Sequence, residues 1–183
     1  LNMAKENARD YLEKHIEKEK LTFNNTMGAV LSLQEALSLR RPPLRMECYD
    51  ISHISGTNKV ASMVVFKNGK AEKSDYRKFN IKYVKGSNDF ASLKEDLQKR
   101  LTRSKNGEGE SVKEMPDLIV IDGGKGQLSS TYEILKEAGF ADKIEIIALA
   151  KKLEEVFVVG KPLPVILKAG SAPLKLLQRI RDE

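Results

Sequence analysis

The sequence lacks several features that define well-known classes of protein. It has one cysteine, Cys48, in 183 residues, which excludes a disulfide framework and a zinc site built from cysteines alone. No apolar run approaches the roughly 20 residues that cross a bilayer, and the charged start contains no secretory signal. There is no internal repeat and no low-complexity tract. We therefore expect one soluble, cytoplasmic globular domain with no membrane partner, cut from a longer protein.

The net charge of +6 is unevenly distributed. Residues 1–40 carry equal numbers of acidic and basic side chains, whereas residues 67–85 carry seven basic residues against Glu72 and Asp75. A focused positive strip suits a polyanion such as DNA, because each neutralised phosphate releases counterions. A solvated, lysine-rich strand edge that prevents aggregation has the same composition. Charge alone leaves both interpretations open.

Hydrophobic periodicity predicts a helical lead-in followed by an α/β body. Apolar side chains recur with helical spacing over residues 3–20, and the pattern breaks at 22–26. A second helix ends before Pro42-Pro43. The body then reads strand, strand, strand, helix, strand, helix, strand, helix. Strands are expected at 45–52, 60–66, 76–83, 117–122 and 144–149, with a short one at 156–159, and helices at 87–101, 128–138 and 172–181.

This order predicts a mixed sheet. Asn68-Gly69, between the second and third strands, is typical of a primed hairpin turn. The apolar run Leu118–Ile121 is typical of a parallel strand that is covered on both faces. Three antiparallel strands followed by two parallel strands, with helices between them, describe a ribonuclease H-like, five-stranded sheet flanked by helices.

Two aspartates occupy positions that favour apolar side chains. Asp50 lies within the first strand and Asp122 ends the fourth. Two carboxylates on neighbouring core strands cost several kcal/mol unless a cation lies between them. If these strands are adjacent, the pair could share Mg²⁺ or Mn²⁺, hard cations that take oxygen ligands, in a site for phosphodiester hydrolysis. Asp122 also has a structural explanation, as the start of the turn into the next helix.

Further residues are candidates for contact with DNA or for catalysis. The three glycines at 123, 124 and 126 allow the backbone to approach a ligand closely, and Lys125 could reach a phosphate. The spacing is not that of a Walker loop, and an ordinary tight turn explains it equally well. Asp89, in the first turn of its helix, is a candidate acid and equally a capping residue. The DNA backbone is expected to contact Lys125 and the basic strip of Tyr76, Arg77, Lys78 and Lys82.

Five ordered motifs give the chain a family resemblance. They are residues 45–56, 76–81, 88–91, 116–128 and 178–183. Together they resemble the C-terminal endonuclease half of UvrC, a subunit of the bacterial nucleotide excision repair nuclease. The resemblance implies a metal-dependent endonuclease, using Mg²⁺ or Mn²⁺ and no small-molecule cofactor, that cuts damaged double-stranded DNA on the 5′ side of a lesion after recruitment by UvrB. It also implies that Asp50 and Asp122 bind the metal and that Asp89 is a third catalytic acid. By the same resemblance, the ribonuclease H-like endonuclease domain is residues 27–183 and residues 1–26 are the end of an interdomain linker.

The chain departs from the family pattern at its end. In the family a catalytic histidine follows the Arg-Asp-Glu motif, whereas this sequence stops at Glu183 and neither His15 nor His53 occupies that position. We expect the fragment to be weakly active or inactive. One alternative is a non-catalytic, ribonuclease H-like DNA-binding or scaffolding module with structural aspartates. Another is an RNA-cleaving ribonuclease H, which would prefer an RNA–DNA hybrid.

Overall fold

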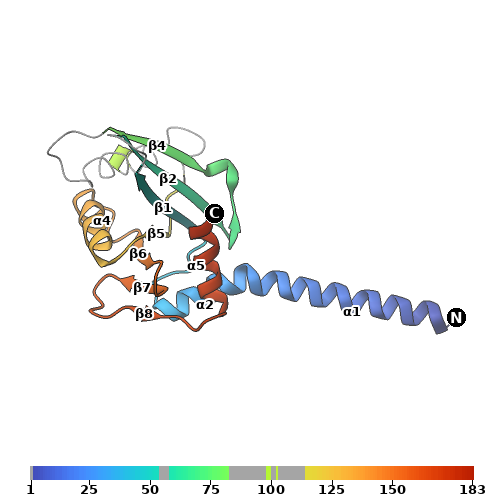
Figure 1. Cartoon of the computed structure of the whole chain (residues 1–183). Helices are drawn as coiled ribbons and strands as arrows, with labels where there is room; N and C mark the ends of the chain where they lie inside the picture. The colour runs from blue at the N-terminus through green and yellow to red at the C-terminus, as the bar shows by residue number, and fades with distance from the viewer. Residues whose placement is uncertain (1, 54–57, 83–97, 100–101, 103–113) are drawn as a thin grey trace.

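The structure is a computed structural model that describes residues 2–53, 58–82, 98–99, 102 and 114–183 (Figure 1). The α-helices are α1 (Asn2–Asn25), α2 (Met27–Leu37), α4 (Lys125–Glu137) and α5 (Ala172–Asp182), and a 3₁₀ turn, η1, spans Lys73–Asp75. The strands are β1 (Arg45–His53), β2 (Asn58–Lys67), β3 (Lys70–Ala71), β4 (Arg77–Lys82), β5 (Leu118–Asp122), β6 (Glu145–Ala150), β7 (Glu155–Val158) and β8 (Val165–Ile166). Among the described residues, no helix is both long and apolar enough to cross a membrane.

All the strands form one mixed sheet in the order β3-β2-β1-β5-β6-β7-β8, with β4 paired to β2. β2 is antiparallel to β1 and to β4, whereas β5 is parallel to β1 and to β6. This confirms the predicted ribonuclease H-like arrangement of three antiparallel strands followed by two parallel ones. The sheet is wider than the five strands expected, because β7 and β8 extend it beyond β6 and β3 extends the hairpin.

Helices cover the two faces of the sheet and divide the core in two. Met46 and Cys48 face the side covered by α2 and α5, whereas Tyr49 faces the side covered by α4. β5 alternates in the same way, with Val120 in the first cluster and Ile121 in the second. Because β-strand side chains alternate between faces, every second residue of β1 and β5 lies on the α5 side.

A buried ionic network ties the start of β1 to η1 on the α4 side of the sheet. Arg45 Nε lies 3.0 Å from Glu47 Oε1, Arg45 Nη1 lies 2.6 Å from Asp75 Oδ2, and the Tyr49 hydroxyl donates to Glu47 Oε2 at 2.9 Å. Lys67 Nζ is 3.3 Å from the same Asp75 oxygen. Burial alone would raise the pKa of Asp75, but the hydrogen bonds and charges of Arg45 and Lys67 lower it. Neutralised charges therefore hold this corner of the fold together.

α1 projects away from the body as a single long helix (Figure 1), and none of its residues is buried. The break predicted at 22–26 is confined to Thr26, because α1 continues to Asn25 and α2 begins at Met27. The hydroxyls of Thr22 and Thr26 donate to carbonyls one turn earlier, at 2.9 and 2.7 Å. Such bonds satisfy polar side chains inside a helix, so a polar run there does not end it.

The hairpin between β2 and β3 has the predicted turn. Asn68 and Gly69 have φ values of 52° and 76°, as primed turns require. A Cβ at Gly69 would also lie 2.5 Å from the Thr26 carbonyl oxygen, so both the conformation and the close approach of the α1–α2 junction require glycine. The helix predicted at 87–101 falls largely outside the described residues.

Candidate active site

The structure brings Asp50 and Asp122 together on one face of the sheet. The parallel register of β1 and β5 pairs Tyr49 with Ile121, so the two aspartates follow on adjacent strands, on the side that α5 covers. The side chain of Asp122 is 6% exposed and Asp50 is half-buried. Both carboxylates act electrostatically on the Cys48 thiol, which places the three groups in one neighbourhood. Two like charges thus lie side by side.

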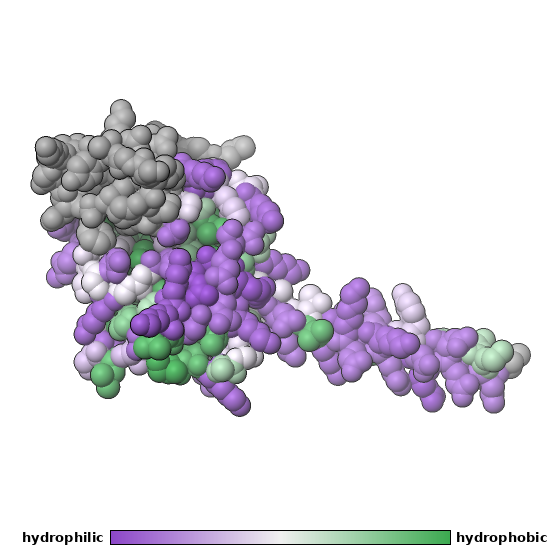
Figure 2. Space-filling view, in the orientation of Figure 1, coloured by the Kyte–Doolittle hydropathy of each residue, from purple (hydrophilic) through white to green (hydrophobic). Residues whose placement is uncertain are grey.

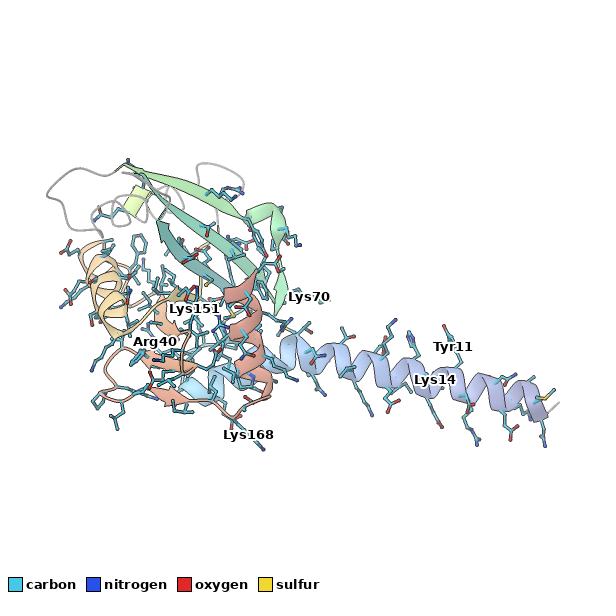
Figure 3. The ribbon with its side chains drawn as sticks, in the orientation of Figure 1. Tyr11, Lys14, Arg40, Lys70, Lys151 and Lys168 are labelled. Carbon is cyan, nitrogen blue, oxygen red and sulfur yellow. The ribbon has the colours of Figure 1, made fainter. Side chains whose placement is uncertain are left out.

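Lys151, which the sequence analysis missed, supplies a positive charge to this pair. Its Nζ lies 2.8 Å from Asp122 Oδ2. The hydrogen bond and charge of Asp122 raise the pKa of Lys151, and the charge of Asp50 adds to the effect. Figure 3 labels Lys151 in the centre of the body. One signal could have found it: Lys151 follows a strand parallel to β5, and the carboxyl ends of parallel strands meet at one edge of a sheet.

A second cation, Arg181 in the last turn of α5, lies near the same pair. Its Nη1 contacts both carboxylate oxygens of Glu154, at 3.1 and 2.9 Å. Its charge lowers the pKa values of Cys48 and Lys151. Glu154 has a φ of 52°, a left-handed conformation that is uncommon outside glycine. Arg181, within the C-terminal motif at 178–183, therefore lies in the neighbourhood of the aspartate pair.

Cys48 is not a nucleophile in this site. Burial, followed by the charges of Asp122 and Asp50, raises the pKa of its thiol to about 12. A thiol is reactive only as the thiolate, so Cys48 stays neutral and packs in the core beneath the two carboxylates.

One predicted DNA-binding residue, Lys78, shares the face of the aspartates. Lys78 lies opposite Ser62, and Ser62 lies opposite Asp50. Directly opposite residues in antiparallel strands project to the same side. With neighbouring strands about 4.8 Å apart, the backbone of Lys78 is about 10 Å from that of Asp50. The exposed Lys78 side chain therefore offers a cation close to the carboxylates.

Two other members of the predicted strip are differently placed. Arg77 lies opposite Met63, which belongs to the core on the α4 side, and its Nη1 donates to the carbonyls of Ser74 and Tyr76 at 2.9 and 2.7 Å. Tyr76 is half-buried and packs against that same core. Burial and then the nearby Glu183 carboxylate raise the pKa of Tyr76. The structure does not bring these two side chains to the aspartates.

The remaining candidates are Lys125, Lys82 and Asp89. Lys125 is exposed at the start of α4, and its Nζ lies 3.3 Å from the Pro162 carbonyl oxygen. The side chain of Lys82 and the whole of Asp89 lie outside the described residues. Their predicted roles stay predictions.

The glycine-containing turn after Asp122 is held by a contact with Gln127 in the first turn of α4. Gln127 Oε1 accepts a hydrogen bond from the Gly124 amide at 2.8 Å. A Cβ at Gly123 would lie 2.9 Å from the Gln127 side chain, which would then have to shift. These contacts are those of an ordinary helix-capping turn, and they fix the direction in which Asp122 leaves β5.

The donor set suits a small divalent cation. Among the described residues no group of three or more His, Cys, Asp or Glu side chains could hold a metal ion, so Asp50 and Asp122 form a two-carboxylate set. Mg²⁺ is commonly held by one or two carboxylates and keeps several of its waters. The ammonium of Lys151 against Asp122 shows that this position already accommodates a positive charge. Asp50 and Asp122 are therefore the residues that could hold a divalent cation.

Comparisons with known proteins point to one family. Residues 34–183 match the family described as the UvrC RNAse H endonuclease domain. The chain is 47% identical, over its whole length, to "UvrABC system protein C" of Dehalococcoides mccartyi and 46% identical to that of Porphyromonas gingivalis, and it spans 30% of the length of each. Among solved structures, the chain is similar to endonuclease V of Ciona intestinalis in complex with a 24mer DNA that contains inosine. The two chains are 15% identical, with a TM-score of 0.42. The match covers 90% of this chain and 67% of the endonuclease V chain.

Proposed function

Because the chain belongs to the UvrC RNAse H endonuclease domain family, we propose that it hydrolyses a phosphodiester bond on the 5′ side of a DNA lesion in nucleotide excision repair, with Mg²⁺ or Mn²⁺. The observation that carries the proposal is the adjacency of Asp50 and Asp122 on the α5 side of the sheet. The curated relatives are about three times as long as this chain. Recruitment by UvrB to damaged double-stranded DNA in the cytoplasm is therefore proposed for the longer protein.

Each residue has a distinct role in this proposal. Asp50 and Asp122 would hold the cation through carboxylate oxygens. A divalent cation there would neutralise charge on the phosphate and favour ionisation of the attacking water. Lys151 holds the Asp122 carboxylate in place through the 2.8 Å contact. Arg181, fixed by Glu154, holds the end of α5 against the pair.

Lys78 would orient the DNA. Its backbone lies about 10 Å from that of Asp50 on the same face, so it can contact a phosphate close to the one that is cleaved. Arg77 faces the other side of the sheet, so we assign it no contact with this phosphate. Phosphate contacts position a duplex without reading its bases. The proposed cleavage is accordingly independent of sequence.

The test measures metal binding and cleavage separately. Calorimetric titration of the chain with Mn²⁺ is expected to show one binding isotherm that Asp50→Asn and Asp122→Asn each abolish, while Asp142→Asn, the same change at an exposed position, leaves it intact. In the longest natural form of the protein, the first two changes are expected to remove 5′ incision of a lesion-bearing duplex. Undiminished Mn²⁺ binding and incision in either variant would overturn the proposal.

One observation favours a second candidate, a non-catalytic DNA-binding module. The Asp122–Lys151 contact satisfies a nearly buried carboxylate without any metal, as a purely structural pair would. Lys151→Met distinguishes the two functions. If the pair is structural, the change destabilises the fold and Mn²⁺ does not restore it. If the pair belongs to a metal site, Mn²⁺ binds the variant at least as tightly and restores its stability.

A further inference from the structure

α1 presents an exposed apolar stripe between two basic borders, and we infer that this stripe docks an amphipathic helix of a partner protein, one with acidic residues along both sides of its own apolar stripe. α1 contacts α2 and α5, and most of its length projects clear of the body (Figure 1). A partner could therefore pack along α1 without covering Asp50 and Asp122.

The stripe consists of side chains that recur every three or four residues. Its members are Ala4, Ala8, Tyr11, Leu12 and Ile16. Tyr11 is 73% exposed, Leu12 56% and Ile16 41%. Tyr11 stacks on His15, with ring centroids 6.2 Å apart, and His15 pairs with Glu19 at 3.3 Å, which ends the stripe. A contiguous, exposed apolar surface rimmed by polar residues is typical of an interaction site.

Charges on α1 are sorted by face. The positions three and four residues apart on a helix are neighbours, so Lys5 and Arg9 line one border of the stripe, and Lys14 and Lys18 line the other. The side of the helix opposite the stripe carries Glu6, Asp10, Glu13 and Glu17. Figure 2 shows α1 mostly from a hydrophilic side, and Figure 3 labels Tyr11 and Lys14.

This sorting selects the partner by charge. A helix packed on the stripe meets the basic borders directly, whereas the acidic side chains project from the opposite side of α1, about 10 Å away across the helix. A partner helix with acidic borders would form favourable ion pairs along both sides of the stripe. A second copy of α1, parallel or antiparallel, would instead bring basic borders against basic borders, and like charges at such positions oppose pairing.

The test uses the intact chain and two synthetic helical peptides. The peptides share one leucine stripe and differ in having Glu or Lys along both of its borders. In fluorescence anisotropy, the Glu peptide is expected to bind about tenfold more tightly than the Lys peptide, because a few weak ion pairs act together. The difference is expected to shrink as salt rises from about 0.05 M to about 0.5 M.

Variants of α1 test the stripe and its borders separately. Changing Leu12→Gln together with Tyr11→Ser is expected to abolish binding of the Glu peptide. Reversing the four border charges is expected to reverse the preference between peptides. The matched control neutralises the opposite side, with Glu6→Gln, Asp10→Asn, Glu13→Gln and Glu17→Gln, and is expected to change affinity by less than about twofold. Circular dichroism checks that each variant keeps its helix.

Four results would overturn the inference. The first is equal affinity for the two peptides or none for either. The second is self-association in sedimentation that Leu12→Gln removes, which would make a second copy the occupant. The third is tighter binding to vesicles of anionic lipid than to the Glu peptide. The fourth is loss of peptide binding in the longest natural form of the protein, where its own chain would then cover α1.

Discussion

Replacing Asp50 by Asn removes one of two like charges on adjacent strands, and its effect on stability can be worked out from the geometry. Neighbouring strands lie about 4.8 Å apart, so the two carboxylates are roughly 5 Å apart, which at an effective dielectric constant of about 20 corresponds to about 3 kcal/mol of repulsion. Asp50 is half-buried, and Lys151 and Arg181 lie nearby. Screening and these cations reduce the net repulsion to about 1 kcal/mol.

We therefore expect Asp50→Asn to stabilise the metal-free protein. A gain of about 1 kcal/mol raises the Tm of a chain of this length by about 2–4 °C. Most substitutions destabilise a protein. A substitution that raises stability at a half-buried position in a central strand would therefore indicate that Asp50 is retained for function at the expense of stability.

Added metal should reverse the order of stability. At a free Mn²⁺ concentration of about 100 times its Kd, a ligand that binds only the folded state contributes about 2.7 kcal/mol. The unsubstituted protein should gain this amount and Asp50→Asn should gain almost none. Urea denaturation followed by circular dichroism, once with EDTA and once with Mn²⁺, measures both effects. Asp142→Asn, at an exposed position, serves as the control.

Two results would refute this reasoning. A loss of more than about 1 kcal/mol in EDTA would mean that favourable contacts hold the Asp50 carboxylate, as expected for a structural residue. An equal gain from Mn²⁺ in both proteins would mean that the ion binds elsewhere.

Three further predictions concern the interior. Glu47→Ala removes the carboxylate that accepts from Arg45 Nε and from the Tyr49 hydroxyl in the buried network and should cost about 3–5 kcal/mol in urea denaturation. The pKa of Asp75 is lowered in the folded state, so its contribution to stability is present above about pH 4 and is lost as the pH falls further. In urea denaturation from pH 7 to pH 3, the free energy of unfolding of Asp75→Asn should therefore fall less than that of the unsubstituted protein. Cys48, with its pKa raised to about 12, should resist a thiol reagent at pH 8 and react in urea, as absorbance would show.

Much of the fold was predictable because its signals are local. The apolar run of β5 and the Asn68-Gly69 turn depend on neighbouring residues, and both predictions are confirmed. β3 and β8 have two residues each, too few to show a period. The break between α1 and α2 is shorter than predicted because the hydroxyls of Thr22 and Thr26 donate to carbonyls within the helix.

The candidate site was predictable only in part. Asp50 was recognisable because a charge interrupts an apolar strand. Arg77 and Lys78 were grouped as one strip, although adjacent residues of a strand face opposite ways, and only Lys78 is on the side of Asp50. Lys151 was signalled only by its position directly after a strand parallel to β5. Arg181 reaches the site through the packing of α5.

Burial of a carboxylate does not by itself indicate function, as two acids three positions apart in β1 show. Glu47 is completely buried, yet Arg45 and Tyr49 donate to its two oxygens, so its charge is neutralised within the fold. Asp50 is less buried, but its neighbour on the adjacent strand is another carboxylate. A fold that places like charges together retains an unfavourable interaction, which a bound cation can offset. This contrast locates the candidate site at Asp50 and Asp122 rather than at the more deeply buried Glu47.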